Sequence, residues 1–543
     1  MSRFPRASPY RASPRRLLRH CALMLSVWPA LAGPAGAFEP ANATLPQLRA
    51  ALDAHEITSA QLVRFYLERI ERFDKAGERI NAILTLNPRA LEQAQRHDAD
   101  ERRGALRGPL DGIPFIVKDN FDTAGIATSG GSAVLRHSVP GFNAFVVQRL
   151  LDAGAILLGK TNMSELAASY GRLGYSSAGG LTLNPYNMRR NASGSSSGSA
   201  AGVAADFAPF ALGTDASGSI RAPASVTGLV GLRPTLGLLS RGGVMPSALS
   251  FDTPGIMTRT VGDLALVLDV IAAQDPRDAA TLGQPQRARS YLSALDASAL
   301  RGVRLGVVTN FRGGNPEVDA AEQAALAVLA AQGAILETLR LPESVQQLWG
   351  SVLAPVSEAE FKPQFERYLR SLPPMQPPIP AQPRTLAQLI RLSSAHPIAD
   401  SATPMNPARL QSLREADATE LTASSAYIRV LSIVMPELRQ QLRALLDTHT
   451  LQALVFPTMS CPASPRFDID DPSYLCASDD PYRASYIGSA SGFPEITVPA
   501  GRVSGNMPVG LSFLGAPYSE ESLIALAAAF EAANPARVPP ELR

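Results

Sequence analysis

Two loops rich in serine and glycine are the places in this sequence where nucleophilic chemistry could occur. The first loop lies at 191–199 and contains Ser195, and the second lies at 213–219. Between them, apolar residues at 200–212 predict a helix followed by a strand, which a flexible linker would not contain. We therefore expect both loops to be tight connections between elements of the core.

The second loop has the position of an anion-binding turn. It follows a predicted strand and opens a predicted helix at Ile220, and N–H groups at such a junction lack helical partners. A serine in this loop would attack a carbonyl carbon while the N–H groups of 216–219 stabilise the developing negative charge. The loop is therefore a candidate for both the nucleophile and the oxyanion hole.

A serine nucleophile requires a base, which is usually histidine. None of the six histidines has neighbours that suggest this role. Lys118 is the better candidate because it ends the apolar run 112–117, and a buried lysine favours the neutral amine that accepts a proton. The alternative is a surface lysine paired with Asp119.

Several separate motifs, in a fixed order along almost the whole chain after residue 37, resemble those of the amidase-signature hydrolases, and especially of bacterial peptide amidases. In addition to the two loops, the motifs are 112–119 (GIPFIVKD), 159–165 (GKTNMSE), 228–235 (GLVGLRPT), 252–255 (DTPG), 496–499 (ITVP) and 507–511 (MPVGL). Such a series is far more specific than one Gly/Ser loop.

The resemblance implies a role for each of the candidate residues. Lys118 would be the general base, Ser195 the bridging serine that follows a cis peptide bond, and Ser219 the nucleophile. The oxyanion hole would consist of the N–H groups of Ala216, Ser217, Gly218 and Ser219. The supporting residues would be Ser196, Asp215 and Arg221. The chain departs from the common family pattern at Ser193, Ser197 and Ser217.

The remaining sequence predicts an α/β fold. Helical spacing at 44–94 predicts amphipathic helices, and the helical, proline-rich stretch at 340–445 predicts a lid or side wall that shapes substrate choice. Short apolar runs predict buried strands at 113–117, 155–158, 207–212, 303–308, 453–456 and 510–513. The resemblance implies one large catalytic domain at 38–543, with a central mixed β-sheet covered by helices on both faces.

The N-terminus has the pattern of a signal peptide. Arginines precede an apolar stretch at 21–31, and the small residues at 35–37 predict cleavage after Ala37. A membrane anchor is the alternative, but the stretch is short for a bilayer and contains Pro29. We expect a periplasmic or secreted protein that is not stably inserted in the membrane after cleavage.

Composition and cysteine content limit the possible partners. A formal net charge of +2 gives no basis for binding nucleic acid. Cys461 and Cys476 form either a disulfide or two unpaired thiols in an oxidising compartment. With two such cysteines and scattered histidines there is no zinc pattern, so we expect neither metal nor cofactor. The expected partner is a small-molecule or peptide amide substrate, without an obligate protein partner.

We interpret the chain as a serine amidase that forms an acyl-enzyme on peptide C-terminal amides or other small amides. An aryl or aliphatic acylamidase, or an esterase, would use the same fold. The G-x-S-x-G match at 194–198 would make Ser196 the nucleophile of an α/β-hydrolase, but the preceding 184–190 is polar and turn-like. A non-catalytic periplasmic binding protein and a component of a tRNA-dependent amidotransferase are further alternatives.

Overall fold

The computed structural model describes residues 38–542 except 288, 375–381, 396–402, 420–421 and 423. The expected signal peptide and part of the proline-rich loop, including Pro377, lie outside the described residues. Glu39–Arg543 forms one compact unit. Within the described ranges, every helix lacks the length or the apolar character needed to cross a bilayer.

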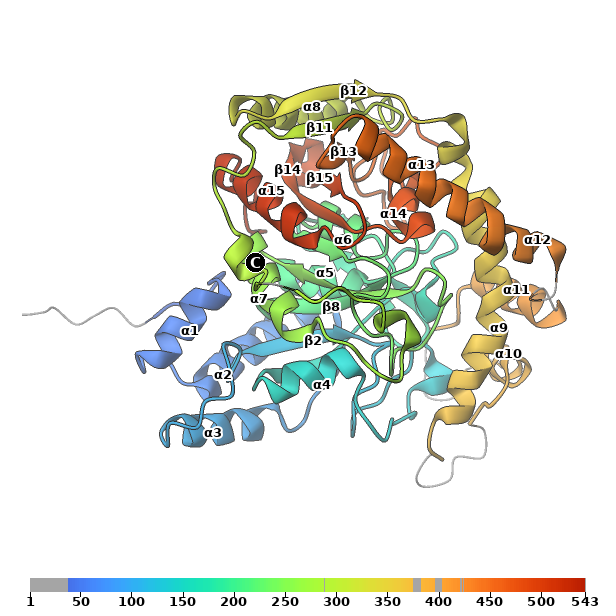
Figure 1. The fold of residues 1–543 in the computed structure, drawn as a ribbon. Coiled ribbons are helices and arrows are strands. Elements are labelled where there is room, and N and C mark those ends of the chain that lie inside the picture. Colours follow the sequence, from blue (N-terminus) through green and yellow to red (C-terminus); the bar gives the residue numbers. More distant parts are fainter. Residues whose placement is uncertain are drawn as a thin grey trace, which may run out of the picture. The chain divides into compact units, whose positions relative to one another are not determined.

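The core of this unit is an eleven-stranded mixed sheet with the strand order β1-β3-β2-β8-β10-β9-β14-β15-β13-β11-β12. Figure 1 shows the sheet with helices around it. Strand β2 is parallel to β3 and β8, β11 is parallel to β12 and β13, and the other neighbours are antiparallel. The strands are β1 (Ile83–Leu86), β2 (Pro114–Lys118), β3 (Ile156–Thr161), β8 (Phe210–Asp215), β9 (Val230–Arg233), β10 (Thr253–Thr258), β11 (Arg304–Val308), β12 (Ile335–Leu339), β13 (Ala453–Pro457), β14 (Glu495–Val503) and β15 (Met507–Leu514).

The six predicted strands correspond to β2, β3, β8, β11, β13 and β15. Strand β8 begins three residues later than its apolar run, at Phe210. Two small hairpins lie outside the main sheet. Their strands are β4 (Tyr175–Ser176), β5 (Gly180–Leu181), β6 (Leu183–Asn184) and β7 (Asn187–Asn191).

Helices pack on both faces of the sheet. In one layer α7 contacts both α4 and α15, and in another α5 contacts α6. Helices α1 and α2 begin at capping boxes, in which Thr44 and Thr58 accept hydrogen bonds from backbone N–H groups. The described helices are α1 (Leu45–Asp53), α2 (Ser59–Arg69), α3 (Ala90–Glu101), α4 (Phe145–Asp152), α5 (Ser197–Ala204), α6 (Arg221–Val226), α7 (Val261–Ile271), α8 (Pro316–Ala331), α9 (Ala354–Ser371), α10 (Leu386–Ser393), α11 (Pro407–Ala418), α12 (Ser425–Arg429), α13 (Met435–Thr448), α14 (Tyr486–Ser491) and α15 (Glu520–Ala533).

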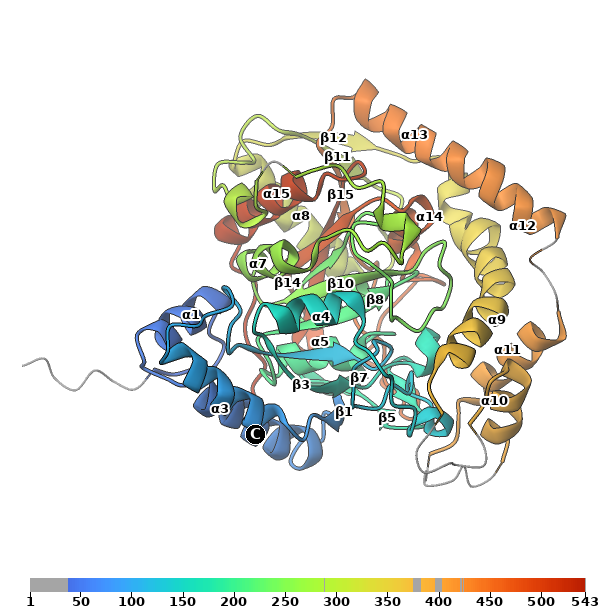
Figure 2. The ribbon, with the colours of Figure 1, turned by 60° about the horizontal axis from the view of Figure 1, so that its bottom comes forward.

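The predicted side wall is built by α9 to α13, which lie together along one side of the sheet in both views (Figures 1 and 2). Its apolar residues are continuous with the core: Phe361 and Leu413 of the wall share a cluster with Leu166 and Met245 of the central region. This packing holds the described part of the wall against the sheet through buried apolar side chains.

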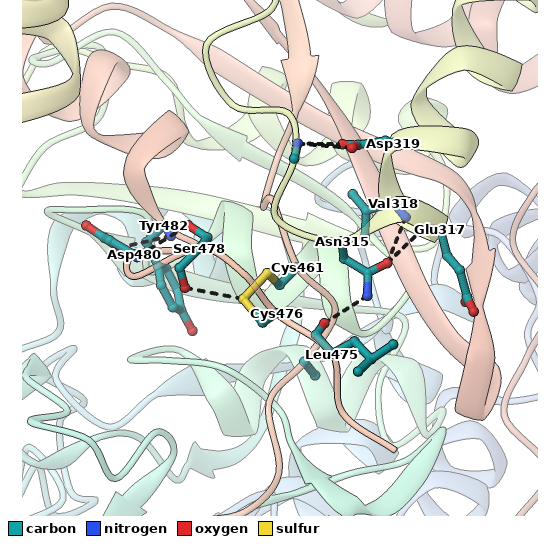
Figure 3. The surroundings of a disulfide bond; sticks show 12 residues. Asn315, Glu317, Val318, Asp319, Cys461, Leu475, Cys476, Ser478, Asp480 and Tyr482 are labelled. Carbon is teal, nitrogen blue, oxygen red and sulfur yellow. Dashed lines mark hydrogen bonds between the residues drawn. A yellow bond between two sulfur atoms is a disulfide. The ribbon is translucent and has the colours of Figure 1, made fainter. Parts of the chain in front are cut away.

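A disulfide joins Cys461 and Cys476, which are 15 residues apart, with a Cα–Cα distance of 5.6 Å (Figure 3). The structure therefore contains the bonded form of the two alternatives. Next to the disulfide, Asn315 Nδ2 donates a hydrogen bond to the carbonyl of Leu475 (2.8 Å). These contacts fix residues 461–485, which we call the disulfide segment, close to the start of α8.

The sheet topology brings the candidate residues to one edge. Because β2 and β8 are parallel, with Val117 opposite Leu212, their carboxyl ends lie side by side. Lys118 is the last residue of β2 and Asp215 is the last residue of β8. The carboxyl edge of parallel strands is where α/β proteins commonly place a site.

Candidate active site

Lys118 is fully buried at the end of β2. Its Nζ lies 2.7 Å from Ser195 Oγ, 2.8 Å from Thr214 Oγ1 and 3.4 Å from the Thr214 carbonyl oxygen. Burial lowers the pKa of Lys118 to about 7, although the carboxylates of Asp215 and Asp252 act in the opposite direction. The side chain can therefore be neutral near neutral pH, as a general base must be.

Ser195 follows the cis peptide bond Gly194–Ser195 in the first Ser/Gly loop. Its carbonyl accepts a hydrogen bond from the N–H of Ser164 (3.1 Å). Upstream, Ser193 adopts a left-handed conformation with φ +58°, and its N–H donates to Asn191 Oδ1 (2.8 Å). Hydrogen bonds on both sides of the cis bond thus orient the Ser195 side chain toward Lys118.

Asp215 closes the second loop. Its carboxylate accepts hydrogen bonds from the N–H groups of Gly218 (2.9 Å) and Ile220 (3.0 Å), and it forms ion pairs with Arg221 and Arg233. Burial raises the pKa of Asp215, but the two guanidinium groups outweigh it and hold the carboxyl well below its usual pKa. Arg221 also pairs with Glu495 on β14, so this ion network joins the loop to a distant strand.

The expected oxyanion hole requires one correction. The Gly218 N–H is already used in the hydrogen bond to Asp215 and is not free for an oxyanion. Within the described part of the chain, the N–H groups of Ala216, Ser217 and Ser219 donate no hydrogen bond. Three of the four expected donors therefore remain available for a substrate oxygen.

Ser219 is 9% exposed and lines two neighbouring cavities. The smaller cavity, of about 10 Å³, is also lined by Ser195, Thr214 and Asp252. The hydroxyl of Ser219 has no hydrogen-bond partner among the described residues, so it is free to rotate toward Ser195 or a substrate. Hydrogen bonds of a catalytic relay commonly tighten only when substrate binds.

Ser196 does not have the environment of a nucleophile. It is fully buried, its hydroxyl donates to the Thr214 carbonyl (3.1 Å), and it accepts from the Thr214 N–H (3.3 Å). The strand that precedes it, β7, belongs to a small hairpin outside the central sheet. This geometry does not fit the nucleophile elbow of an α/β-hydrolase, which follows a central strand.

Sequence reasoning assigned no role to four residues that complete the site. Thr214 binds Lys118 Nζ and also accepts from Asn120 Nδ2 (3.0 Å). From the disulfide segment, Tyr482 Oη lies 2.8 Å from Ser193 Oγ, and Ser485 Oγ donates to the Ser217 carbonyl (3.2 Å). Thr214 and Asn120 could have been suspected from their motifs, because each lies within two residues of a candidate. The other two carry no such signal.

A cavity of about 560 Å³ adjoins Ser219 and the oxyanion loop. Its lining includes five aromatic side chains and several residues of the predicted side wall at 340–445. Residues that line it include Tyr170, Trp349, Glu358, Phe361, Arg409, Glu415, Tyr482 and Tyr486. Its size suits a small organic or peptide substrate.

Comparisons with known proteins identify a family and several relatives of this chain. The amidase family model matches residues 61–524. A peptide amidase structure from Stenotrophomonas maltophilia is 38% identical, with a TM-score of 0.80, and covers 92% of this chain and 98% of its own. An amidase family protein from Bacillus anthracis is 30% identical with a TM-score of 0.79, covering 92% of each chain. A component of the glutamyl-tRNA(Gln) amidotransferase of Deinococcus radiodurans is 34% identical over 504 residues, 90% of this chain and 97% of the relative.

The mixed sheet with helices on both faces is therefore the amidase-signature fold. The chain belongs to the amidase family and is an enzyme that acts on amide C–N bonds. Among the residues that the structure describes, no group of three or more His, Cys, Asp or Glu side chains could hold a metal ion.

Proposed function

We propose that this enzyme is a serine amidase with Lys118 as base, Ser195 as bridge and Ser219 as nucleophile. The observation that carries the proposal is the buried Lys118 Nζ at 2.7 Å from Ser195 Oγ, beside the cavity lined by Ser219. A neutral lysine has two N–H groups, which suit the two oxygens of Thr214, and a lone pair, which suits the Ser195 hydroxyl.

The cycle begins when Lys118 takes the proton of Ser195, which in turn takes the proton of Ser219 as that oxygen attacks the amide carbon. The tetrahedral oxyanion accepts hydrogen bonds from the N–H groups of Ala216, Ser217 and Ser219. Ser195 then returns a proton to the departing amine or ammonia. Water cleaves the acyl-enzyme through the same relay.

For the substrate, we propose C-terminally amidated peptides. The cavity of about 560 Å³ can hold a peptide-sized acyl group, and a relative at 38% identity is a peptide amidase. Aryl or aliphatic amides and esters remain the alternatives on the same site. The leaving group that the enzyme prefers decides among them.

The test is to measure ammonia release from amidated dipeptides and nitroaniline release from the matching N-acyl p-nitroanilides. Ser219→Ala and Lys118→Ala should each lower kcat by about 10³-fold or more, because nucleophile and base act as one unit. Ser196→Ala, which removes a neighbouring hydroxyl from the same loop, should lose far less. Full activity of Ser219→Ala would refute the proposed nucleophile.

We also propose that the protein is exported and acts without an obligate partner. The predicted signal peptide and the disulfide support an oxidising compartment. The D. radiodurans relative is part of an amidotransferase, so glutamine is the substrate to test against this view. Mass spectrometry of the protein from its native host should find an N-terminus at Phe38, and the isolated chain should hydrolyse amidated peptides faster than glutamine.

A further inference from the structure

Arg409 is a buried cation in the wall of the substrate cavity. It lies on α11, is only 5% exposed and lines the same cavity as Ser219. Helix α11 is fixed there by Asn406, whose Nδ2 donates to the carbonyls of Ser169 (2.9 Å) and Tyr170 (3.1 Å), which also line the cavity. These hydrogen bonds hold α11, and with it Arg409, at the cavity.

Arg409 lacks the carboxylate partner that the chain's other buried arginines have. Within the described residues, no Asp or Glu oxygen lies within 4 Å of its guanidinium nitrogens. By contrast, each of the other arginines that are at least nine-tenths buried forms an ion pair. These are Arg190, Arg221, Arg233 and Arg259. A buried charge without a counter-ion is costly, so its retention calls for an explanation.

The guanidinium also has unused hydrogen-bond donors. Nη2 donates to the Leu166 carbonyl (3.3 Å) and Nη1 to Ser412 Oγ (3.2 Å), and both acceptors are neutral. Nε is buried without a partner. Tyr170 is a further side-chain partner of the guanidinium, so at least two of the five N–H groups of the arginine remain unused.

Two aromatic rings hold the guanidinium in place. Arg409 Cζ lies 4.8 Å from the ring centre of Phe361 and 5.6 Å from that of Tyr170, and both residues line the cavity. Contacts with ring faces leave the edge of the guanidinium available, and this edge is the part that binds a carboxylate with two parallel hydrogen bonds.

None of the acidic groups nearby forms an ion pair with Arg409. The buried Glu165 acts on it through space, but its carboxylate accepts hydrogen bonds from the N–H (2.9 Å) and hydroxyl (2.8 Å) of Ser177, and burial raises the pKa of Glu165 to about 7. Glu358 and Glu415 line the cavity but are exposed to solvent. The wall thus presents a buried positive charge that a bound substrate could complement.

We propose that Arg409 determines specificity by pairing with a carboxylate of the substrate, so that the cavity selects peptide amides with an acidic residue. This inference rests on the proposed amidase function, because it takes the bound molecule to be an amide. Its experiment measures binding, which tests the role of Arg409, separately from turnover, which tests the proposed amidase function. Failure of either proposal can then be told from failure of the other.

The experiment uses the full-length mature chain carrying Ser219→Ala, which binds but does not turn over. The probes are Ac-Glu-Ala-NH₂, Ac-Gln-Ala-NH₂, Ac-Ala-Glu-NH₂ and Ac-Ala-Gln-NH₂, with Kd measured by calorimetry. At either the first or the second residue of the dipeptide, the peptide with Glu should bind about 10- to 100-fold more tightly than the peptide with Gln. This is the range expected for a hydrogen-bonded charge pair.

Variants then test the residue itself. Arg409→Met, which keeps the length and apolar contacts, should bring the Glu/Gln ratio of Kd values to about one, and Arg409→Lys should retain part of the preference. Arg414→Met removes the same charge from an exposed position on α11 and should leave the ratio unchanged. Circular dichroism checks that each variant folds. If Arg409→Met does not fold, the proposal is tested by the Glu/Gln ratio of Kd values with Arg409 intact and by its decrease in Arg409→Lys.

Equal binding of Glu and Gln at both positions, or a preference that survives Arg409→Met, would overturn the proposal. The parent chain with Ser219 intact is assayed on the same four amides. Hydrolysis of all four without an acidic preference supports the amidase function and refutes the role of Arg409. Selective binding of the acidic amides without hydrolysis supports the role of Arg409 and refutes the proposed turnover of peptide amides.

Discussion

The chemistry of the site depends on the environment of single residues, above all on that of Lys118. An exposed lysine is protonated at neutral pH and cannot act as a base. Here burial lowers the pKa to about 7, and the oxygens of Thr214 accept the hydrogen bonds of a neutral amine. The carboxylates of Asp215 and Asp252 oppose the shift without cancelling it.

This environment predicts the pH dependence of the enzyme. The active form has neutral Lys118, so protonation below its pKa of about 7 removes the base. For a peptide amide without ionisable groups, kcat/KM should rise about tenfold per pH unit below pH 7 and level off above it. A profile that is flat from pH 5 to 9, or that falls with rising pH, would show that Lys118 is not the base.

At this scale the sequence predicted residues whose neighbours in the chain reveal them. Lys118 ends an apolar run, and Ser219 lies between a strand and a helix, so the sequence offers both as candidates. Tyr482 was not, because its partner Ser193 is 289 positions away and only the folded chain brings them together. The engagement of the Gly218 N–H by Asp215 was equally hidden, since it depends on how the loop closes.

Among the elements, the oxyanion loop between β8 and α6 depends on one glycine. Gly218 has φ +107°, and a Cβ atom built there would lie 2.3 Å from Ser485 Oγ. Gly218→Ala should therefore displace the loop and lower kcat by about 100-fold, the effect of losing an oxyanion donor. Steady-state kinetics on an amidated dipeptide measures this loss.

The matched control for this prediction is Gly104→Ala. Gly104 also has positive φ, at +71°, but a Cβ atom there would meet nothing within 4 Å. That variant should lose about 1 kcal/mol of stability and keep its kcat. An equal loss of kcat in both variants would mean that backbone strain, and not the contact with Ser485, explains the effect.

Helix α9 is tied to the loop after β2 by one buried hydrogen bond. Tyr368 Oη donates to Asp122 Oδ1 (2.7 Å), and burial raises the pKa of Asp122 to about 7 despite that bond. Tyr368→Phe leaves the carboxyl without its donor and should lower the free energy of unfolding by about 1–3 kcal/mol. Thermal unfolding should show no comparable change for Tyr518→Phe, whose hydroxyl has no partner among the described residues.

Two of the strands that the sequence did not predict, β10 and β14, share a physical cause. Strand β10 contains Pro254 and β14 contains Glu495 and Pro499, which are unusual in buried strands. Glu495 is accommodated because Arg221 and the Ser512 hydroxyl bind its carboxylate. Its partner is far away in the sequence, so the compensation could not be predicted, whereas uniformly apolar strands such as β2 and β13 could.

At the scale of the whole catalytic unit, the site joins distant parts of the chain. Ser195 and Ser219 come from its first half, and Tyr482 and Ser485 reach the same loops from the disulfide segment. That segment is also held at Arg190, which pairs with Asp471. The disulfide therefore closes a segment whose end contacts both Ser/Gly loops.

Loss of the disulfide should consequently affect both stability and activity. The double variant Cys461→Ser/Cys476→Ser no longer restricts the unfolded chain, and for a 15-residue separation this costs about 3 kcal/mol. We expect a lower melting temperature, faster proteolysis within 462–475 and a lower kcat, because Tyr482 and Ser485 lose their fixed positions. Reductant should produce the same changes in the parent protein and none in the variant. If the variant melts and turns over like the parent, the disulfide has no part in holding the two loops.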